Sequence, residues 1–471
     1  MQIGIDTERG ELRLASSVVG FDVRVPMLDG SHSRYVNLDN AATTPCLAVV
    51  QAKVNEFLQW YSSIHRGTGF KSILSTHVYQ RARQIVGEFV QAASDTGTVI
   101  FVRNTTEALN KLARRFPFAE GDVVLSSVME HHSNLLPWRT VAQVDHVGVR
   151  PDGSLDLDEL ERKLDFHRGK VRLVSITAAS NVTGYVNPVH EIARLAHQAG
   201  SLIAVDAAQL AAHRPLDMRQ HGAPDHLDFV ALSAHKMYAP FGSGALIGPR
   251  HFFERGAPDE VGGGAVEFVT LDDVRWADAP ERDEAGTPNV VGAVAMATAC
   301  KALKQIGFEA IAAHEAELTR YLLQRMKEVP VLRVFGLGDP ARAHERLGVV
   351  SFAIDGIPDG FVASILSYEG GIGVRSGCFC AHPYVLLLLE VPEEMAGYYR
   401  TRIAAGDRSE VPGLVRVSLG LYNTKEDIDR LIEMLLRISR GQYAGNYVVD
   451  KSTGLYNPRG IDLRVESDFR I

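Results

Sequence analysis

Lys236 has the clearest chemical use of any residue in this sequence, because of where it stands. It follows an apolar run at residues 228–233, which is typical of a buried parallel strand. Open α/β sheets place ligands at the carboxyl ends of such strands. An amine there is costly to desolvate unless its charge is paired or its pKa falls, and Schiff-base chemistry requires a lowered pKa. Taken alone, however, a lysine that leaves a strand is usually a solvated surface residue.

Asp206 provides a second indication, directly after a predicted strand at residues 202–205. A carboxylate at the end of a buried strand is expensive unless it meets a cation. Thr105 and Thr106 begin a predicted helix, where hydroxyls and free N–H groups form a natural phosphate cradle. A plain N-cap explains those two residues equally well, so they support a phosphate site only together with the other residues.

Pyridoxal phosphate explains these groups together. An Asp keeps its ring nitrogen protonated, which makes the ring an electron sink, and a Lys forms its Schiff base. The chain offers a strand-end Asp, a strand-end Lys, hydroxyls at a helix start and a histidine, His131, after another predicted strand. We therefore predict this cofactor. His131 and His132 are adjacent and point in different directions, so we expect no metal between them.

Cys380 is the candidate nucleophile. Most cysteines are small buried hydrophobic residues, but Cys380 lies in a polar loop that contains glycines and Arg375. A reactive thiolate needs an electropositive setting, which Arg375 and His382 provide in this interpretation. Cys378 forms a Cys-X-Cys pair with it. That pair lacks two further ligands for a metal site, and the other alternative is a disulfide between the two cysteines.

The composition argues against several classes of protein. The chain has 471 residues, 46% hydrophobic and 23% charged, with a net charge of −8 that gives no support to nucleic-acid binding. Four cysteines do not make a disulfide framework. The first residues lack the pattern of a signal peptide, and the apolar run at 385–389 is far shorter than the roughly 20 residues of a membrane span. We expect a cytoplasmic protein with no membrane or nucleic-acid partner.

The order of predicted elements indicates two α/β domains. Strands and helices alternate from about residue 98, as in βαβ units with a parallel sheet, and the alternation stops after Gly248. Neither a Rossmann phosphate fingerprint nor a Walker loop is present. The predicted division is listed here in chain order: an N-terminal arm that belongs to the small domain at 1–36, a large cofactor-binding domain at 37–295, a small C-terminal domain at 296–440 and a tail at 441–471.

The sequence resembles the class V aminotransferase family of fold-type I pyridoxal-phosphate enzymes, and within it the group II cysteine desulfurases and selenocysteine lyases. The matching stretches are LDNAATTP, NTTEALN, MEHHSNLLPW, SNVTGYVNP, VDAAQ, SAHKMYAPFGSG, EAGTPN, RSGCFCAHP and VRVSLGLYNT, which extend from about residue 36 to 440. The resemblance implies an α/β fold: a large domain with a mainly parallel, seven-stranded sheet between helices, and a smaller α/β C-terminal domain.

The resemblance also implies roles for individual residues. Lys236 matches the Schiff-base lysine, Asp206 the partner of the ring nitrogen, Gln209 a contact of the ring hydroxyl, and His131 the imidazole stacked on the ring. Thr106, Ser233 and His235 match phosphate contacts, with Thr105 nearby. Asn181 and Arg416 match the residues that hold the substrate carboxylate, and Arg375 serves substrate or thiolate. Gly286 and Thr287 match residues that reach the partner protomer's phosphate, which implies a homodimer with composite active sites.

The reaction implied by the resemblance is cysteine desulfuration, with alanine and a Cys380 persulfide as products. The alternatives are a selenocysteine lyase, or a class V aminotransferase, epimerase or C–S lyase of specialised metabolism. A non-catalytic scaffold is disfavoured by the intact Lys236, Asp206 and His131. Cys378 departs from the group II pattern, and its GCFC string also resembles molybdenum-cofactor sulfurases. An insert at about 390–413 follows the cysteine loop, where the alternatives are a lid, a docking place for a sulfur-acceptor protein or a sign of a different substrate.

Overall fold

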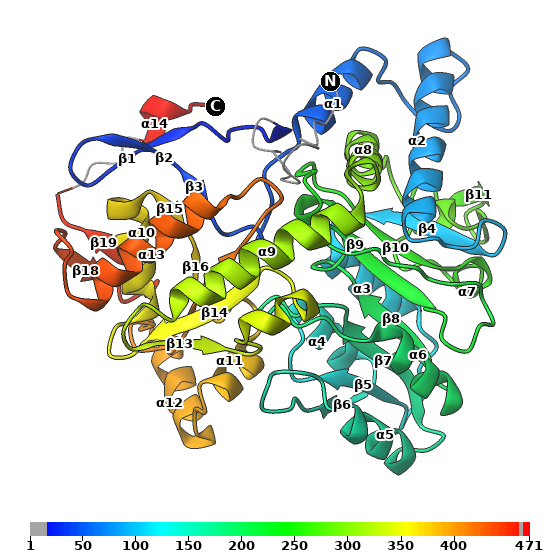
Figure 1. The fold of residues 1–471 in the computed structure, drawn as a ribbon. Helices are drawn as coiled ribbons and strands as arrows, with labels where there is room; N and C mark the ends of the chain where they lie inside the picture. Colours follow the sequence, from blue (N-terminus) through cyan, green and yellow to red (C-terminus); the bar gives the residue numbers. More distant parts are fainter. Residues whose placement is uncertain (1–16, 461–464) are drawn as a thin grey trace. The chain divides into compact units, whose positions relative to one another are not determined.

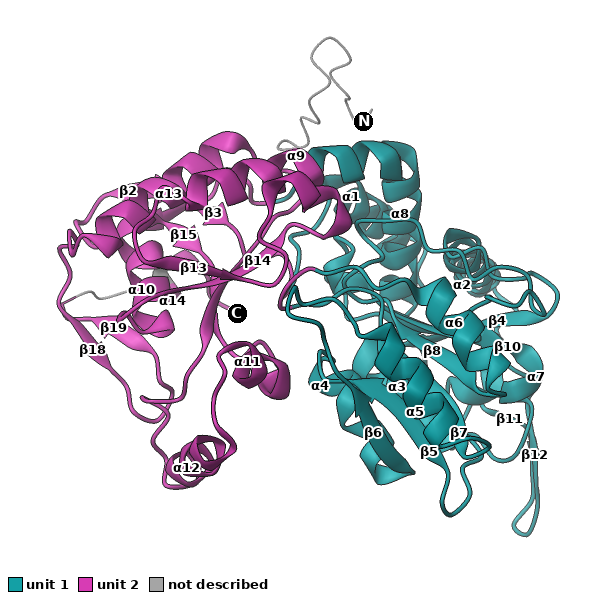
Figure 2. Ribbon diagram, turned by 60° about the horizontal axis from the view of Figure 1, so that its bottom comes forward, with its two compact units in different colours: residues 1–19, 43–181, 185–314 teal, residues 20–42, 182–184, 315–471 magenta. Residues whose placement is uncertain are grey.

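The computed structural model describes residues 17–460 and 465–471, which form two compact units (Figure 2). Of the described residues, unit 1 comprises 17–19, 43–181 and 185–314, and unit 2 comprises 20–42, 182–184, 315–460 and 465–471. The N-terminal arm predicted at 1–36 lies partly outside the described residues. The domain limits expected from the sequence stay a prediction.

Unit 1 is built on a seven-stranded sheet with the strand order β4–β10–β9–β8–β7–β5–β6 (Figure 1). The strands are β4 (Gly97–Val102), β5 (Val123–Ser127), β6 (Gln143–Val147), β7 (Val171–Thr177), β8 (Leu202–Asp206), β9 (Phe229–Ser233) and β10 (Gly244–Pro249). Strand β10 is antiparallel to both of its neighbours, β4 and β9, and the remaining neighbouring pairs are parallel. The predicted α/β fold with a mainly parallel seven-stranded sheet is confirmed. Because β7, β8 and β9 are parallel, their carboxyl ends meet at one edge.

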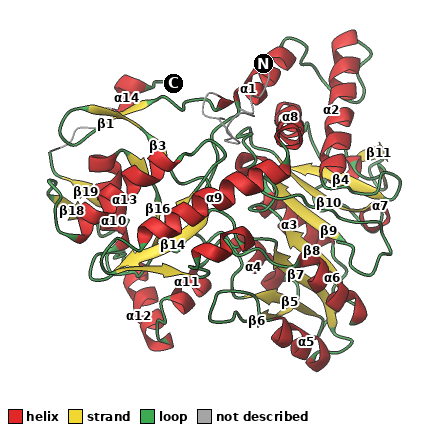
Figure 3. Cartoon of the chain, in the orientation of Figure 1, coloured by secondary structure: helices red, strands yellow, loops and turns green. Residues whose placement is uncertain are grey.

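Helices of unit 1 pack on this sheet and on one another (Figure 3). They are α1 (Ala48–Leu58), α2 (Phe70–Phe89), α3 (Thr105–Arg115), α4 (His132–Leu135), α5 (Leu157–Phe166), α6 (Val189–Gln198), α7 (Arg250–Phe253) and α8 (Val290–Ile306). Helix α3 shows why the pattern folds this way: Ala108, Leu109 and Leu112 are buried against Ile100 and Leu246 of the sheet. A two-stranded ribbon, β11 (Val266–Val269) and β12 (Val274–Trp276), completes the unit.

Helix α2 begins earlier than its apolar pattern predicts. The sequence indicates a helix from about residue 78, preceded by a polar loop, but α2 starts at Phe70 with Gly69 as its N-cap. The residues that its first turns bury are polar, namely Ser72 and Ser75, and the Ser72 hydroxyl donates to the Ser63 carbonyl of the preceding loop at 2.7 Å. Phe70 and Ile73 are exposed instead, so the apolar pattern does not mark the start of the helix.

Unit 2 contains a four-stranded antiparallel sheet with the order β13–β14–β17–β16. These strands are β13 (Leu332–Phe335), β14 (Val349–Ile354), β17 (Leu414–Ser418) and β16 (Arg375–Gly377). Helices α10 (Asp359–Gly370) and α13 (Lys425–Ser439) pack on each other, and α13 begins with a capping box formed by Thr424 and Asp427. Their buried faces share one apolar core with the sheet.

The other elements of unit 2 are short. They are β1 (Arg24–Pro26), β2 (His32–Arg34), β3 (Val36–Asn37), β15 (Ile372–Gly373), α11 (His382–Leu388), α12 (Glu393–Ala404), β18 (Tyr447–Val449), β19 (Tyr456–Pro458) and α14 (Val465–Asp468). Helix α9 (Phe308–Met326) carries the chain from unit 1 into unit 2. The predicted insert contains α12, which buries none of its residues. The predicted tail contains the β18–β19 hairpin and α14.

Candidate active site

Asp206 and Lys236 follow neighbouring strands at one edge of the unit 1 sheet. Asp206 is the last residue of β8, is 4% exposed, and accepts a hydrogen bond from the Ala208 N–H at 3.0 Å. Burial raises the pKa of Asp206, while the charge of Lys236 acts in the opposite direction. Lys236 is half-buried and ends a 3₁₀ turn, η3 (Ala234–Lys236), directly after β9. The two charged groups are therefore coupled at this edge.

The start of helix α3 meets the end of β9. Asn104 is the N-cap, and its side chain accepts from the Glu107 N–H at 3.0 Å. The Ser233 hydroxyl accepts from the Thr105 N–H at 2.8 Å and lies 2.9 Å from the Thr105 hydroxyl. Because Asn104 provides the cap, the threonines are left for other contacts. The structure thus brings the predicted phosphate contacts Thr105 and Ser233 together.

His131 is held by its neighbour at the start of α4. Its Nδ1 accepts from the Ser133 N–H at 3.1 Å and lies 3.0 Å from the Ser133 hydroxyl, which also contacts the Thr106 hydroxyl at 2.7 Å. Because Nδ1 accepts the backbone bond, the proton of the neutral ring is on Nε2. His131, Ser133 and Thr106 therefore form one chain of contacts, which links two of the predicted site residues.

Glu130 is a buried carboxyl that the sequence interpretation missed. It accepts from the Asn134 side chain at 2.7 Å, from the Ser127 hydroxyl at 2.5 Å and from the Thr177 N–H at 3.1 Å. Burial raises the pKa of Glu130 to about 8, despite these hydrogen bonds. Its place beside His131 in the MEHHSN motif was the available signal.

Three other predicted residues lie near strand ends of unit 1. Gln209 and Asn181 are buried, in the segments that follow β8 and β7. The backbone carbonyl of His235 accepts from the Thr44 N–H at 2.9 Å. Burial and the adjacent Lys236 charge lower the pKa of the His235 ring to about 4. At neutral pH this ring is therefore neutral.

Gly286 and Thr287 lie in a different part of unit 1. They line a cavity of about 440 Å³ together with residues 63–66, and Arg66 is its only arginine among the described lining residues. No other residue predicted for the site is among those that line this cavity. Gly286 has φ +82°, a left-handed conformation that favours glycine. Glu284, two residues earlier, accepts from both Nη atoms of the buried Arg83, at 2.7 and 2.9 Å.

Arg375 and Arg416 of unit 2 share one carboxylate, Asp39. These arginines face each other across β16 and β17. The Asp39 oxygens lie 2.8 Å from Arg375 Nη2 and 2.9 Å from Arg416 Nη2. Burial lowers the pKa of Arg416, and Asp39 opposes that shift. The sequence interpretation used Asp39 only as part of the LDNAATTP motif and did not assign it this partner.

The two cysteines of the GCFC string differ sharply in environment. Cys380 is exposed, whereas Cys378 is buried and its thiol donates to the Pro412 carbonyl at 3.5 Å. Burial raises the pKa of Cys378 to about 12, which keeps it a thiol. Phe379 and Cys380 have φ values of +50° and +55°, a costly conformation for residues other than glycine. The Phe379 ring lies 4.9 Å from the Arg416 guanidinium.

His382 does not have the setting that the sequence interpretation gives it. It lines a cavity of about 600 Å³ in unit 2, together with Cys378, Asp359 and Arg408. Burial lowers the pKa of His382, and the charge of Arg408 lowers it further. The ring is thus neutral at pH 7 and supplies no positive charge to a thiolate. Among the described residues, no helix combines the length and the apolar character that a membrane span requires.

Comparison with known proteins identifies the family. Aminotransferase class-V matches residues 36–431. The chain belongs to the class V aminotransferase family. A probable cysteine desulfurase of Halalkalibacterium halodurans is 36% identical over 421 residues, which cover 87% of this chain and 95% of that protein. A cysteine desulfurase of Haloferax volcanii is 34% identical over 445 residues, 92% of this chain and 96% of that protein.

Solved structures give the same family. An apo cysteine desulfurase from Thermococcus onnurineus NA1 matches with a TM-score of 0.76 and 30% identity, over 86% of this chain and 95% of that chain. A cysteine desulfurase from Escherichia coli matches with a TM-score of 0.72 and 28% identity, over 87% of this chain and 96% of that chain. The predicted family is therefore confirmed, and this class V protein is an enzyme of the cysteine desulfurase type.

Proposed function

We propose that this class V enzyme is a cysteine desulfurase, which removes sulfur from L-cysteine and leaves L-alanine and a persulfide on Cys380. The observation that carries the proposal is in unit 2. The exposed Cys380 follows Phe379, whose ring contacts the guanidinium of the buried Arg416. A guanidinium suits a carboxylate and a thiol suits the transfer of sulfur, so this pair fits a sulfur-containing amino acid.

The residues at the edge of the unit 1 sheet fit pyridoxal phosphate. Asp206 is a buried carboxylate whose charge burial disfavours, and a protonated ring nitrogen supplies the cation it needs. We assign the Schiff base to Lys236 and phosphate contacts to Thr105, Thr106, Ser233 and His235. Gln209 and His131 complete the proposed set. When bound, this cofactor withdraws electrons from the α-carbon of the substrate, which weakens the bond to sulfur.

The chain's own residues have separate roles in the proposed reaction. Arg416 binds the substrate carboxylate, a role that Asn181 shares in this proposal, and Arg375 steadies the same region through Asp39. Lys236 Nζ moves the α-proton, and His131 holds a proton at Nε2 and is the second candidate for that transfer. The Cys380 thiolate attacks the substrate sulfur: an S–S bond forms and the C–S bond breaks. The released carbon keeps the electron pair and takes a proton to become alanine.

Assembly and location belong to the same proposal. The cavity lined by Gly286, Thr287 and Arg66 offers a cation to a phosphate, while Glu267 and Glu281 also line it. Its lining supports the homodimer with composite active sites that the sequence implies. The exposed helix α12 supports a docking role for the insert towards a sulfur-acceptor protein. The cytoplasmic location stays a prediction from the sequence.

Cys378 provides a matched control for the central experiment. The purified, cofactor-loaded enzyme is given L-cysteine, and alanine and sulfide are measured. We expect C380A to lose at least about 100-fold in alanine formation, equivalent to about 2.7 kcal/mol, while C378A stays within a few-fold of wild type. Retained alanine formation in C380A would refute the persulfide step. Parallel assays with L-selenocysteine and with a keto-acid acceptor distinguish the selenocysteine lyase and aminotransferase alternatives.

A further inference from the structure

A second cluster of titratable side chains lies at the opposite ends of the strands that carry Asp206 and Lys236. Asp228 directly precedes β9, and its Oδ2 accepts from the Ile203 N–H of β8 at 2.9 Å. Because β8 and β9 are parallel, this marks the amino ends of both strands. His197 comes from the last turn of α6 and His226 from the segment before β9. The proposed function gives no role to these three residues.

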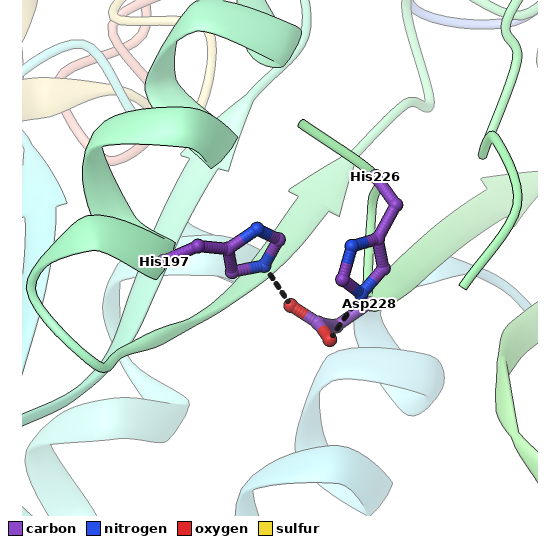
Figure 4. A group of neighbouring side chains, drawn as sticks. All are labelled: His197, His226 and Asp228. Atoms are coloured by element: carbon purple, nitrogen blue, oxygen red, sulfur yellow. Dashed lines mark hydrogen bonds and ion pairs between the residues drawn. The ribbon is translucent and has the colours of Figure 1, made fainter. Parts of the chain in front are cut away.

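The three side chains converge on a common point (Figure 4). His197 Nε2 lies 2.9 Å from Asp228 Oδ2, and His226 Nε2 lies 3.2 Å from Asp228 Oδ1. One ligand atom from each residue lies within 4.8 Å of the other two. Tetrahedral zinc has Zn–N bonds of about 2.0–2.1 Å, so its ligand atoms stand roughly 3.3 Å apart. The two N···O distances are close to that spacing, and the ligand atoms of all three residues lie within 4.8 Å of one another.

Both rings have their other nitrogen fixed in the way that metal-binding histidines do. His197 Nδ1 lies 2.9 Å from the Pro224 carbonyl, and His226 Nδ1 lies 2.6 Å from the Ala223 carbonyl. A carbonyl only accepts, so Nδ1 is the donor in each ring and Nε2 is the atom turned to Asp228. A backbone carbonyl on the second ring nitrogen is the usual outer-shell partner of a metal-bound histidine.

From this geometry we propose that His197, His226 and Asp228 form a binding site for a divalent transition-metal ion, with Zn²⁺ as the best match. Two imidazoles and one carboxylate are a ligand set that zinc prefers. Where Nε2 hydrogen-bonds to the carboxylate it carries a proton. A bound Zn²⁺ takes the place of those protons, so zinc binding competes with proton binding and releases protons.

A fourth position for the ion is available beside the cluster. His226 and Asp228 line a small cavity together with His221, and its volume of about 30 Å³ has room for a water molecule. The His221 ring centroid lies 4.9 Å from that of His226. Water in this cavity is the fourth ligand in this proposal, because only His197, His226 and Asp228 have ligand atoms within 4.8 Å of one another among the described residues.

The site has a structural role in this proposal. It joins the end of α6 to the segment before β9. That segment is part of the chain that connects Asp206 to Lys236. An ion that binds only the folded chain stabilises it by mass action. Zinc should therefore raise the midpoint of thermal unfolding and leave the rate constant of the reaction with L-cysteine within a few-fold.

Variants of the two histidines test the proposal on the full-length, cofactor-loaded protein. H197Q and H226Q keep a side-chain N–H that can donate to Asp228 but remove a zinc ligand. H167Q is the matched control, because His167 makes an ordinary pair with Asp145 at 2.9 Å without a second histidine. After chelator treatment, Zn²⁺ is titrated against a chromophoric chelator. We expect H197Q and H226Q to lose zinc affinity by roughly 100-fold or more. Loss of an outer-shell partner already costs up to about 100-fold, and these variants lose a direct ligand. H167Q should bind zinc like wild type.

Binding of zinc by the exposed Cys380 is common to all these proteins, so the differences between variants isolate the cluster. Equal zinc affinity in wild type, H197Q and H226Q would overturn the proposal. If a variant does not fold, wild-type crystals soaked in Zn²⁺ decide the question by anomalous diffraction at the zinc edge. A peak between His197, His226 and Asp228 supports the site, and peaks only elsewhere reject it.

Discussion

Asp39 is the residue whose importance depends most on the fold. It places one carboxylate oxygen on Arg416 and the other on Arg375, and Arg416 is 3% exposed. A buried guanidinium without a counter-charge is costly, so the carboxylate fixes both the charge and the direction of Arg416. In the proposed mechanism Asp39 is a positioning residue, because it acts through the arginine that binds the substrate.

Replacing Asp39 by Asn should weaken substrate binding. Asn keeps the size of the side chain but loses the charge, so D39N should raise KM for L-cysteine by roughly 10–100-fold, in line with about 1.5–3 kcal/mol for a charged hydrogen bond. The value of kcat should change much less. E410Q is the control, because Glu410 pairs with Arg402 at an exposed position of the same unit. A lower KM in D39N would mean that Asp39 competes with the substrate for Arg416.

The contrast between Lys236 and Asp39 explains what sequence can predict at this scale. Lys236 and Asp206 each follow an apolar strand, so a local pattern marks them, and the structure has them at neighbouring strand ends. Asp39 meets Arg416 across 377 residues of chain. Glu130 likewise meets Thr177 47 residues later. No local pattern encodes such partners, because they depend on how distant segments pair.

At the scale of elements, one buried ion pair ties helix α2 to the sheet and to the loop that carries Gly286. Arg83 of α2 donates to both oxygens of Glu284, and the Phe101 N–H of β4 donates to the same carboxylate at 2.6 Å. The Tyr79 hydroxyl donates to it at 2.7 Å. Both charged side chains are largely buried, at 10% and 3% exposure. The Glu of the EAGTPN motif thus has a structural partner.

Breaking this pair should destabilise the protein far more than breaking a surface pair. E284Q leaves the Arg83 charge buried without its counter-charge, and we expect a loss of about 3–5 kcal/mol in the free energy of unfolding. E88Q removes the exposed pair of Glu88 with Arg81 on the same helix, which should cost less than about 1 kcal/mol. Urea unfolding of both variants measures the difference. Similar losses in the two would contradict the assigned role.

Helices and strands could be predicted from the sequence where buried apolar residues recur at regular spacing. They could not be predicted where the buried residues are polar or absent. The parallel strands follow from apolar runs that alternate with helices, and β9 is buried throughout, whereas the number of seven strands was implied by the family resemblance. About the first two turns of α2 were missed because the residues they bury are serines, and the whole of α12 was missed because it buries none of its residues. The antiparallel β10 was seen as a strand, but its direction depends on pairing with β4 and β9.

At the scale of the whole molecule, each unit holds a carboxyl group that favours its neutral form. Burial raises the pKa of Glu130 in unit 1 from 4.5 to about 8, and that of Asp359 in unit 2 from 3.8 to about 6. The unfolded chain releases each proton at the lower value, whereas the folded chain keeps it to the higher one. The stabilisation is therefore complete below the unfolded pKa and is lost as pH rises through the folded pKa.

The two units should consequently respond to pH over different ranges. For Glu130 the free energy of unfolding should fall between pH 4.5 and about 8, by at most about 5 kcal/mol at about 1.4 kcal/mol for each pKa unit. For Asp359 it should fall between pH 3.8 and about 6. E130Q should remove the first slope and D359N only the second, because each amide stays neutral. Urea unfolding of wild type and both variants from pH 4 to 8.5 measures the slopes. If E130Q keeps the wild-type slope above pH 6, Glu130 is ionised in the folded protein, and its three hydrogen bonds outweigh the cost of burying its charge.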